Sequence, residues 1–403
     1  MNRKQFTILI VVGLIVGGLG VHLSRKDSAS WKSGGEGMGV KLAGDLAVND
    51  VTQIVVKQEK GELNLVKANE IWTVKERGGY PANFGEIKEF LSKVWELKSV
   101  QKEEVGDSQL QRLELVEPGK GVGAGTAVYL KGKDGKSIRS LLLGKKHMKK
   151  GGGASPMGGG DDGWPDGRWV RVLEDAKQKD ASLVTETFSQ IEPKPDQWLS
   201  KDFFKVEKIK SIAVTHPEAT NSWTLKRETE AGEMVLTDAR EGEKLDTSKV
   251  YSQANAFASA SFNDVVVGES KPEQTGLDKP IVAKIETFDH FLYTIKVGKG
   301  SGEENFHMTL AVDATLPKER EPGKDEKKED KERLDKEFKD KLEKQKEKLA
   351  KEKELEKWVF VTSKWTVEPV QKARKDLLVE KKDPAAADAA KDAMPKIPGL
   401  APQ

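Results

Sequence analysis

The chain begins with one long run of apolar residues, Phe6 to Leu23. Eighteen residues at about 1.5 Å per residue form a helix of roughly 27 Å, just enough to cross a hydrocarbon core of about 30 Å. Basic residues flank the run, Arg3 and Lys4 before it and Arg25 and Lys26 after it. We predict a transmembrane signal anchor at 6–23, with residues 1–5 in the cytoplasm and the rest of the chain outside, because long downstream domains translocate regardless of weak flanking charge.

Two alternatives to the anchor stay open. The run is short and ends in small residues, Gly17, Gly18 and Gly20, as a cleaved signal peptide does, although no Ala-x-Ala site follows. A buried core helix is the other alternative, but it leaves the flanking basic residues without a reason. Residues 24–44 begin with a stretch rich in Ser, Gly and Lys, and we interpret them as a flexible tether.

Beyond the tether, apolar and polar residues alternate in short stretches that are typical of half-buried strands, and the stretches occur in two similar series. Each series opens with one strand and continues with two more, and a further strand follows a helix. The strands expected in the first series are 51–57, 63–67, 71–76 and 99–105, and those in the second are 209–215, 223–227, 234–238 and 264–267.

A helix is predicted in the middle of each series. In the first, Asn83 and Glu86 have the spacing of a capping box, and the stripe of apolar residues Ile87, Phe90, Leu91, Val94 and Leu97 follows the helical repeat. In the second, Asp246 or Thr247 caps a weaker stripe that runs from Val250 to Ala258. A further helical stretch is expected to close each series, at 186–204 and at 368–378.

Strand pairs follow in both series. The strands 127–131 and 137–143 flank the turn Lys133-Asp134-Gly135, and Asp-Gly is a strong hairpin signal. The strands 281–288 and 292–297 flank Asp289-His290. The stretches 169–172 and 358–361 both begin with Trp-Val, and we match them as the next strand of each series.

Two short motifs align the series without a gap. Residues 105–108 (VGDS) match 267–270 (VGES), and 115–118 (LVEP) match 277–280 (LDKP). Both pairs have the same separation of 162 positions (267 − 105 and 277 − 115). The sequence therefore predicts an internal duplication: an α+β protein with an N-terminal transmembrane helix and two β-rich modules, 45–206 and 207–382, with helices on one face of each sheet.

Two loops differ between the modules. The first module has a Gly-rich stretch, 145–167, which we expect to be a solvated loop. The second has the stretch 317–357, which holds 16 Lys+Arg and 15 Asp+Glu. We interpret it as a charged helical insertion exposed to solvent; a coiled coil is the alternative, but its heptads are not sustained. Residues 383–403 are rich in Pro, Ala and Lys, and we expect a disordered tail.

Composition narrows the classes of function. The 403 residues carry 68 Lys+Arg and 66 Asp+Glu, a formal net charge of +2, which argues against a globally basic nucleic-acid binder. There is no Cys, so disulfides, thiolate nucleophiles and Cys-ligated metals are excluded. We therefore expect no nucleic-acid partner.

Motifs that carry chemistry are weak. No pair of the five His has the spacing of a helical metal site, and the acidic residues Asp161, Asp162 and Asp166 do not form an EF-hand pattern. The glycines at 119–125 lack the Gly-Lys-Ser/Thr of a phosphate loop. We predict no catalytic residue, no metal ligand and no cofactor.

Tryptophan is the remaining signal for a binding site. Most Trp residues lie in expected strands or helices, where core packing explains them. Trp164 lies in the Gly-rich loop instead, so it is the candidate contact with a ligand or partner.

Three stretches resemble the domain-of-unknown-function family 4340. They are 71–121, which contains the Trp strand, the Pro-led helix, Val-Gly-x-Ser and Leu-x-x-Pro; 140–146 (SLLLGKK); and 167–172 (GRWVRV). The resemblance is strong in the first module and weak in the second. It implies a bacterial protein with one membrane helix, often encoded beside an ABC-type permease and its auxiliary subunit of the kind linked to gliding motility. It implies no catalytic residues.

These features together predict a non-catalytic, membrane-anchored subunit that binds or assembles with an ABC-type transporter or an envelope complex. The expected location is the bacterial inner membrane, crossed once by Phe6–Leu23, with the bulk of the chain periplasmic. An alternative is a module that binds a cell-wall polymer or another envelope ligand, for which an exposed Trp in a concave surface would be evidence. A hydrolase is a third hypothesis.

Overall fold

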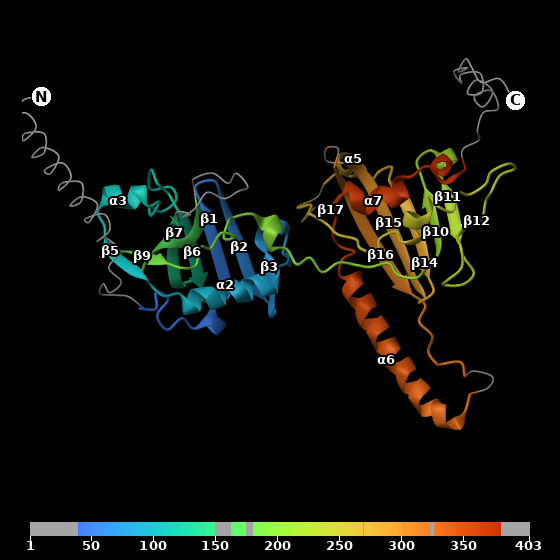
Figure 1. Cartoon of the computed structure of the whole chain (residues 1–403), viewed down its shortest axis with the longest axis horizontal. Coiled ribbons are helices and arrows are strands. Elements are labelled where there is room, and N and C mark those ends of the chain that lie inside the picture. The colour runs from blue at the N-terminus through green and yellow to red at the C-terminus, as the bar shows by residue number, and fades with distance from the viewer. Residues whose placement is uncertain are drawn as a thin grey trace, which may run out of the picture. The chain divides into compact units, whose positions relative to one another are not determined.

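The chain divides into two compact units, residues 1–200 and 201–403. The computed structural model describes residues 39–149, 163–174, 180–268, 270–300, 302, 304–322 and 326–379. The strands form two antiparallel sheets, one in each unit (Figure 1).

Unit 1 contains a nine-stranded sheet. Its order is β4-β3-β2-β1-β6-β7-β8-β9-β5. The strands are β1 (Gln53–Gln58), β2 (Gly61–Ala68), β3 (Ile71–Val74), β4 (Tyr80–Pro81), β5 (Gln101–Glu104), β6 (Thr126–Lys131), β7 (Ser137–Lys149), β8 (Trp164–Val172) and β9 (Asp180–Val184). The helices are α2 (Phe84–Glu96) and α3 (Asp107–Arg112), with 3-10 turns η1 (Val48–Asp50), η2 (Lys75–Arg77) and η3 (Pro195–Trp198).

Unit 2 contains an eight-stranded sheet. Its order is β12-β11-β10-β14-β15-β16-β17-β13. The strands are β10 (Ile209–Thr215), β11 (Trp223–Lys226), β12 (Val235–Leu236), β13 (Asp264–Val265), β14 (Ile281–Thr287), β15 (Phe291–Gly300), β16 (Asn305–Ala314) and β17 (Phe360–Ser363). The helices are α4 (Tyr251–Ala254), α5 (Pro272–Thr275), α6 (Lys328–Lys353) and α7 (Lys364–Gln371), with 3-10 turns η4 (Ala219–Asn221) and η5 (Arg374–Leu377).

The two sheets share one strand order. Without β4, the unit-1 order β3-β2-β1-β6-β7-β8-β9-β5 corresponds strand by strand to the unit-2 order β12-β11-β10-β14-β15-β16-β17-β13. In both orders the first three strands of the unit come in reverse, the hairpin strands and the last two strands follow, and the strand after the helix lies at the edge. The turn after the short helix repeats as well. The N–H of Leu115 donates to the carbonyl of Leu110 (2.8 Å), and the N–H of Leu277 donates to that of Pro272 (2.9 Å). The partners of the two bonds lie 162 positions apart (272 − 110).

Two glycines mark the same close contact in both units. A Cβ on Gly144 of β7 would lie 2.4 Å from the carbonyl oxygen of Leu113, and one on Gly298 of β15 would lie 2.2 Å from that of Thr275. Such distances are too short for a side chain, so each hairpin needs glycine where the turn after the short helix crosses it. The repeat therefore includes the packing of this turn on the sheet.

The prediction of an α+β class is wrong, because β-sheet makes up most of the regular secondary structure of the described residues. Stretches expected to be helical are short or extended. The stretch 186–204 contains Pro193 and Pro195, and only the single turn η3 forms there, since proline disfavours helix in the residue before it. The helix expected over 246–258 is reduced to α4, which ends at Ala254, and the left-handed backbone of Phe257 (φ 62°) is incompatible with a helix that continues to 258.

In unit 1, the helices α2 and α3 also do not share one face of the sheet (Figure 1). Leu110 of α3 packs against Ala127, Leu142 and Ala181. These residues alternate along their strands with Val128 and Leu141, which are buried on the opposite side. In unit 1, α3 therefore covers the face opposite the one that Val128 and Leu141 line.

The predicted transmembrane helix at 6–23 lies outside the described residues, as do the first part of the tether and the tail 383–403. Among the described residues, no helix is both long enough and apolar enough to cross a membrane. Residues 39–44, assigned to the tether from the sequence, pair with unit 1: the N–H of Leu42 donates to the carbonyl of Leu97 (2.9 Å), and Ala43 is buried.

Several local predictions are confirmed. The Asn83 side chain caps α2 by accepting from the N–H of Gly85 (3.0 Å) and Glu86 (3.3 Å), and the predicted apolar stripe is buried. Both hairpins form, with β6 paired to β7 and β14 paired to β15. His290 supplies the left-handed residue of the second turn (φ 68°).

The match between Trp169–Val172 and Trp358–Val361 is wrong, because the two stretches do not belong to equivalent strands. Trp169 lies in β8, beside β7, and the strand in the same place in unit 2 is β16. Trp358 precedes β17, which corresponds to β9. The mismatch arises because the charged stretch is inserted between β16 and β17, whereas the Gly-rich stretch lies between β7 and β8.

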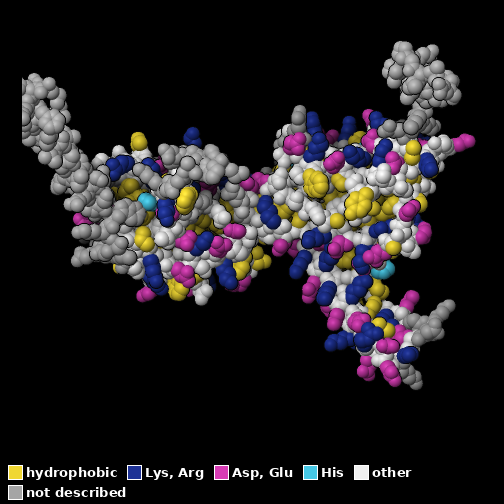
Figure 2. All heavy atoms as spheres, viewed as in Figure 1, with side chains coloured by type: hydrophobic (Ala, Val, Ile, Leu, Met, Phe, Trp, Pro, Cys, Tyr) yellow, Lys and Arg dark blue, Asp and Glu magenta, His cyan; other side chains and the backbone are white. Residues whose placement is uncertain are grey.

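The charged stretch forms helix α6, which is attached to unit 2 by its C-terminal part. Buried Glu352 accepts from the Tyr293 hydroxyl (2.9 Å), the N–H of Lys205 (3.2 Å) and the ammonium group of Lys348 (2.9 Å). Burial and the neighbouring Glu352 carboxylate raise the pKa of Tyr293, so its hydroxyl stays a donor. The rest of α6 extends away from the strands, and Figure 2 shows acidic and basic side chains mixed along it.

Candidate functional site

Each unit has a groove in the same place relative to its sheet. It lies between the helix that precedes the edge strand (α2 or α4) and the segment that follows β9 or β17. The unit-1 groove encloses about 560 Å³ and the unit-2 groove about 490 Å³. We define the unit-1 groove by the charged and aromatic residues Glu86, Glu89, Phe90, Lys93, Glu186, Phe188, Glu192, Lys194 and Trp198, and the unit-2 groove by Tyr251, Ser252, Asn255, Phe257, Ala260, Trp365, Thr366, Glu368 and Pro369.

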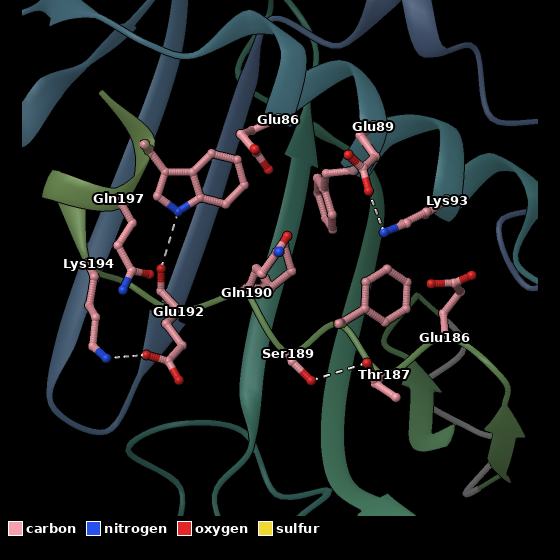
Figure 3. A pocket seen from close by; sticks show the side chains of 14 residues that line it. Glu86, Glu89, Lys93, Glu186, Thr187, Ser189, Gln190, Glu192, Lys194 and Gln197 are labelled. Atoms are coloured by element: carbon pink, nitrogen blue, oxygen red, sulfur yellow. Dashed lines mark hydrogen bonds and ion pairs between the residues drawn. The ribbon is translucent and has the colours of Figure 1, made fainter. Parts of the chain in front are cut away.

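The unit-1 groove is charged at its rim and aromatic at its floor (Figure 3). On α2, the ammonium group of Lys93 lies 2.6 Å from the Glu89 carboxylate, and this hydrogen bond raises the pKa of Lys93. On the facing segment, the ammonium group of Lys194 lies 2.5 Å from the Glu192 carboxylate, and the bond lowers the pKa of Glu192. These four charges are therefore already paired within the groove wall.

The floor of the unit-1 groove is held by ring contacts. The ring of Phe90 meets Phe188 edge to face with centroids 6.1 Å apart, and meets Trp198 at 6.4 Å. The indole N–H of Trp198 donates to the carbonyl of Glu192 (3.4 Å). Because the rings lock α2 to the segment 186–198, this groove is rigid and offers mostly polar groups to a ligand.

Arg168 of β8 fixes the outer wall of the unit-1 groove. Its guanidinium donates to the carbonyls of Gly144 (2.7 Å), Phe188 (3.1 Å) and Thr187 (3.3 Å). Burial lowers the pKa of Arg168, but guanidinium remains charged at any physiological pH. Arg168 is therefore a positioning residue, and it shapes the backbone at Phe188, where φ is 47°.

The unit-2 groove presents two large aromatic side chains to solvent. Tyr251 is 77% exposed and Trp365 is 76% exposed. Tyr251 begins α4 and Trp365 lies in the first turn of α7, so the two rings come from opposite walls. On the visible face of unit 2, hydrophobic side chains gather over the region of α7 (Figure 2).

The walls of the unit-2 groove are tied together below the rings. The buried side chain of Gln253 donates to the carbonyl of Pro369 (3.1 Å), which links α4 to α7. The Thr366 hydroxyl donates to the carbonyl of Ser261 (3.3 Å). The one charged side chain that lines the groove, Glu368, lies 3.1 Å from Lys372 at its rim. The exposed rings are therefore carried on a fixed frame and project above it.

The two grooves have diverged in chemistry. The unit-1 groove has four Glu and two Lys among its lining residues, and the unit-2 groove has a single carboxylate with two exposed rings. A paired, solvated charge gives little binding free energy, whereas exposed Trp and Tyr side chains are the groups that anchor partners. The unit-2 groove is the stronger candidate for a binding site.

Trp164, the contact residue predicted from the sequence, is the first residue of β8 and is 57% exposed. It pairs in register with Lys149 of β7 and lines neither groove. Of the Trp residues expected to pack in the core, Trp72, Trp198 and Trp223 are buried, whereas Trp169 and Trp358 are half-buried. Trp95 is partly exposed, with the ammonium group of Lys41 4.3 Å from its ring centroid.

A smaller cavity of about 240 Å³ lies on unit 1 beside His147 and Trp169. His147 Nδ1 lies 2.6 Å from the Asp166 carboxylate. Asp161 and Asp162, the other acidic residues that we considered for calcium, lie outside the described residues. Among the described residues there is no group of three or more His, Asp or Glu side chains that could hold a metal ion.

Sequence reasoning missed Tyr251 and Trp365. The closing helix of the second series was expected to begin at 368. Trp365 therefore lay outside the expected helix, and the groove wall that α7 forms was not predicted. A signal was present: Ser363 is an N-cap residue type directly before Lys364 and Trp365, while Val367 and Val370 form the buried stripe of α7. On that helix, Trp365 falls on the side away from the stripe.

Comparison with known proteins agrees with the family resemblance seen in the sequence. Residues 159–280 match the family model described as Domain of unknown function (DUF4340). The match runs from the start of β8 through α5, so it covers the end of unit 1 and the first half of unit 2, whereas the sequence motifs placed the stronger resemblance in unit 1. No curated protein and no solved structure matches the chain. Over residues 159–280, the chain is therefore similar to the DUF4340 family.

Proposed function

We propose that this chain is a non-catalytic binding and assembly subunit that uses the unit-2 groove as its contact site. The observation that carries the proposal is the pair of exposed rings, Tyr251 and Trp365, on a groove whose frame is fixed by hydrogen bonds. Soluble proteins seldom leave Trp exposed to this degree without a use for it, since burying the ring is strongly favourable.

The rings supply enough apolar area for an anchored contact. An aromatic side chain buries about 150–250 Å², which at about 25 cal/mol per Å² corresponds to ~4–6 kcal/mol per ring before the costs of association. Hot-spot aromatic residues cost about 2 kcal/mol or more when they are truncated. Two such rings are sufficient for the central contact of an interface with a protein partner.

The proposal includes the location that the sequence predicts. The run Phe6–Leu23 would attach the chain to the bacterial inner membrane, with both units outside the cytoplasm, and an ABC-type permease, its auxiliary subunit or another envelope complex would be the partner. Support for this part comes from the sequence alone. Alkaline extraction of membranes tests the attachment: the chain should stay in the pellet, and release into the supernatant would remove this part of the proposal.

The contact site is tested by affinity capture of the full chain from solubilised membranes. Trp365→Ala and Tyr251→Ala should each lower recovery of the transporter or envelope partner at least tenfold, without changing the fold, since both side chains are exposed. Trp164→Ala is the matched control, because it removes an exposed Trp from unit 1. If Trp164→Ala abolishes recovery and Trp365→Ala does not, the contact site lies in unit 1 and the proposal for the unit-2 groove is wrong.

A second candidate function is binding of a cell-wall polymer or another envelope glycan. Trp365 favours it, because an exposed indole beside the hydroxyl and amide groups of Ser252 and Asn255 is an arrangement that can stack on a sugar ring and bond its hydroxyls. Cosedimentation of the chain with insoluble peptidoglycan tests it. This function predicts sedimentation that Trp365→Ala abolishes, whereas a protein-binding role alone predicts none.

A further inference from the structure

The unit-2 groove has the features of a site for a polyproline II segment. Grooves that bind such segments are lined by Tyr and Trp rings, and the extended ligand lays its proline rings between them. Here Tyr251 and Trp365 stand above a floor that includes Phe257 and Pro369. The Asn255 amide donates one proton to the carbonyl of Tyr251 (2.9 Å) and keeps a second for a carbonyl of an extended backbone, which forms no internal hydrogen bonds in this conformation.

The chain itself contains a segment of matching chemistry. Residues 394–403 read MPKIPGLAPQ, and Pro395-Lys396-Ile397-Pro398 is a P-x-x-P motif. In a polyproline II helix three residues make one turn with about 3.1 Å per residue, so Pro395 and Pro398 lie on the same side about 9 Å apart. Lys396 supplies a positive charge, and the one carboxylate in the groove lining, Glu368, is already paired with Lys372, so charge adds little to the match. No other stretch of the sequence contains three prolines within eight residues.

The connection between this segment and unit 2 is long enough. Val379, the last described residue, is fixed to unit 2 because its N–H donates to the carbonyl of Lys244 (2.9 Å). Fifteen positions separate Val379 from Met394 (394 − 379). They span about 50 Å when fully extended and about 20 Å on average as a flexible chain. A unit of this size has a radius of gyration of about 16 Å, so the segment reaches the groove.

We propose that residues 394–403 dock in the unit-2 groove of the same chain as a polyproline II segment, with Pro395 and Pro398 against Tyr251 and Trp365. The inference rests on the proposed function, because it describes regulation of the same groove: a partner must displace the segment before it contacts the rings. A short flexible linker gives an effective concentration on the order of 1 mM. If the free segment bound with a Kd of about 0.1 mM, docking would weaken partner binding roughly tenfold.

The full chain allows a direct test, because it contains no Cys and a single one can be labelled. A nitroxide on Gln403→Cys is combined with 5-fluorotryptophan, and the Trp365 signal is assigned by its loss in Trp365→Phe. The spin label should broaden the Trp365 fluorine signal at least threefold more than the Trp164 signal. Pro395→Ser with Pro398→Ser should remove that broadening and should raise partner recovery roughly tenfold.

Three outcomes would overturn the inference. They are equal broadening of the Trp365 and Trp164 signals, broadening that survives the two proline substitutions, and broadening of the Trp365 signal in fluorinated chains without a nitroxide when these are mixed with nitroxide-labelled chains. The last result would mean docking between copies. The proposed function is judged separately. It stands if Trp365→Ala abolishes partner recovery while the proline substitutions have no effect, and it fails if the segment docks while Trp365→Ala leaves partner recovery unchanged.

Discussion

At the scale of single residues, a buried arginine holds the outer edge of unit 2. Arg374 is 3% exposed and its guanidinium donates to the carboxylates of Asp238 (2.6 Å) and Glu243 (2.7 Å). It also donates to the backbone carbonyl of Ser222 (3.4 Å). Arg374 therefore joins η5 to the loop after β12 and to the residue that precedes β11.

Replacing Arg374 with Met should destabilise unit 2. The substitution leaves two carboxylates without their cation and removes donors to backbone carbonyls, and breaking such a buried pair costs about 3 kcal/mol. Urea unfolding followed by the fluorine NMR signal of 5-fluorotryptophan at Trp223, which is buried in unit 2, measures the change. Arg333→Met on α6 is the control, because its ion pairs with Asp330 and Glu337 are exposed to solvent and should contribute little to stability.

Glu243 predicts a pH dependence. Hydrogen bonds from the Arg374 guanidinium and the Arg240 N–H lower the pKa of Glu243 to about 2. A lowered pKa in the folded state adds stability above the unfolded value of about 4.5, and this stability is lost as the pH falls from there toward 2. Glu243→Gln should therefore flatten the pH dependence of unit-2 unfolding between pH 4.5 and 2 relative to the parent chain, and an unchanged slope would show that the Arg374–Glu243 pair does not set it.

At the scale of elements, the sequence was most informative where one signal acts locally. Asn83 and the buried stripe of α2 predicted that helix, and Asp-Gly predicted the first hairpin. The helices at 186–204 and 246–258 were mispredicted because proline and a left-handed Phe257 override a weak apolar period. The sequence could not identify Trp365 as the best candidate contact among the Trp residues. Its exposure depends on which face of α7 packs against α4, and a single sequence does not show such a tertiary contact.

The attachment of α6 gives a prediction for one element. Glu352→Ala removes the acceptor for Tyr293, Lys205 and Lys348, and leaves the buried Tyr293 hydroxyl with only a long bond to the carbonyl of Lys205 (3.4 Å). We expect a loss of about 2 kcal/mol and faster hydrogen exchange of amides in 341–357, measured by mass spectrometry. Glu354→Ala, at an exposed neighbour on the same helix, should leave exchange unchanged; equal effects would mean that Glu352 is not the attachment point.

At the scale of the whole molecule, the two units share one fold but have grooves lined by different types of side chain. The strand order and the turn after the short helix repeat, while the grooves differ in charge and in exposed rings. The sequence revealed the repeat through two motifs with the same separation. It did not reveal the fold class, because stretches that we expected to be helical form only short helices or turns between the strands. Proteins that duplicate a unit can keep the frame in both copies while one copy gains a new contact surface.

The shared frame predicts matched effects of one substitution in both units. Gly144→Ala and Gly298→Ala each place a Cβ within 2.4 Å of a backbone carbonyl, so each should destabilise its own unit by about 2 kcal/mol or more. Thermal unfolding of the full chain should show one transition shifted by each variant. Gly132→Ala, whose added Cβ meets no atom closer than 3.5 Å, is the control; a loss in only one unit would argue that the turn does not carry the same packing in both.

Photo-crosslinking from the unit-2 groove tests the central claim most directly. A photoreactive phenylalanine placed at position 365 or 251 of the full chain, in the membranes of its own host, should crosslink to one envelope protein that mass spectrometry identifies, and the same residue at position 164 should not. If positions 365 and 251 give no more product than position 164, the rings are not a contact site and the account is contradicted.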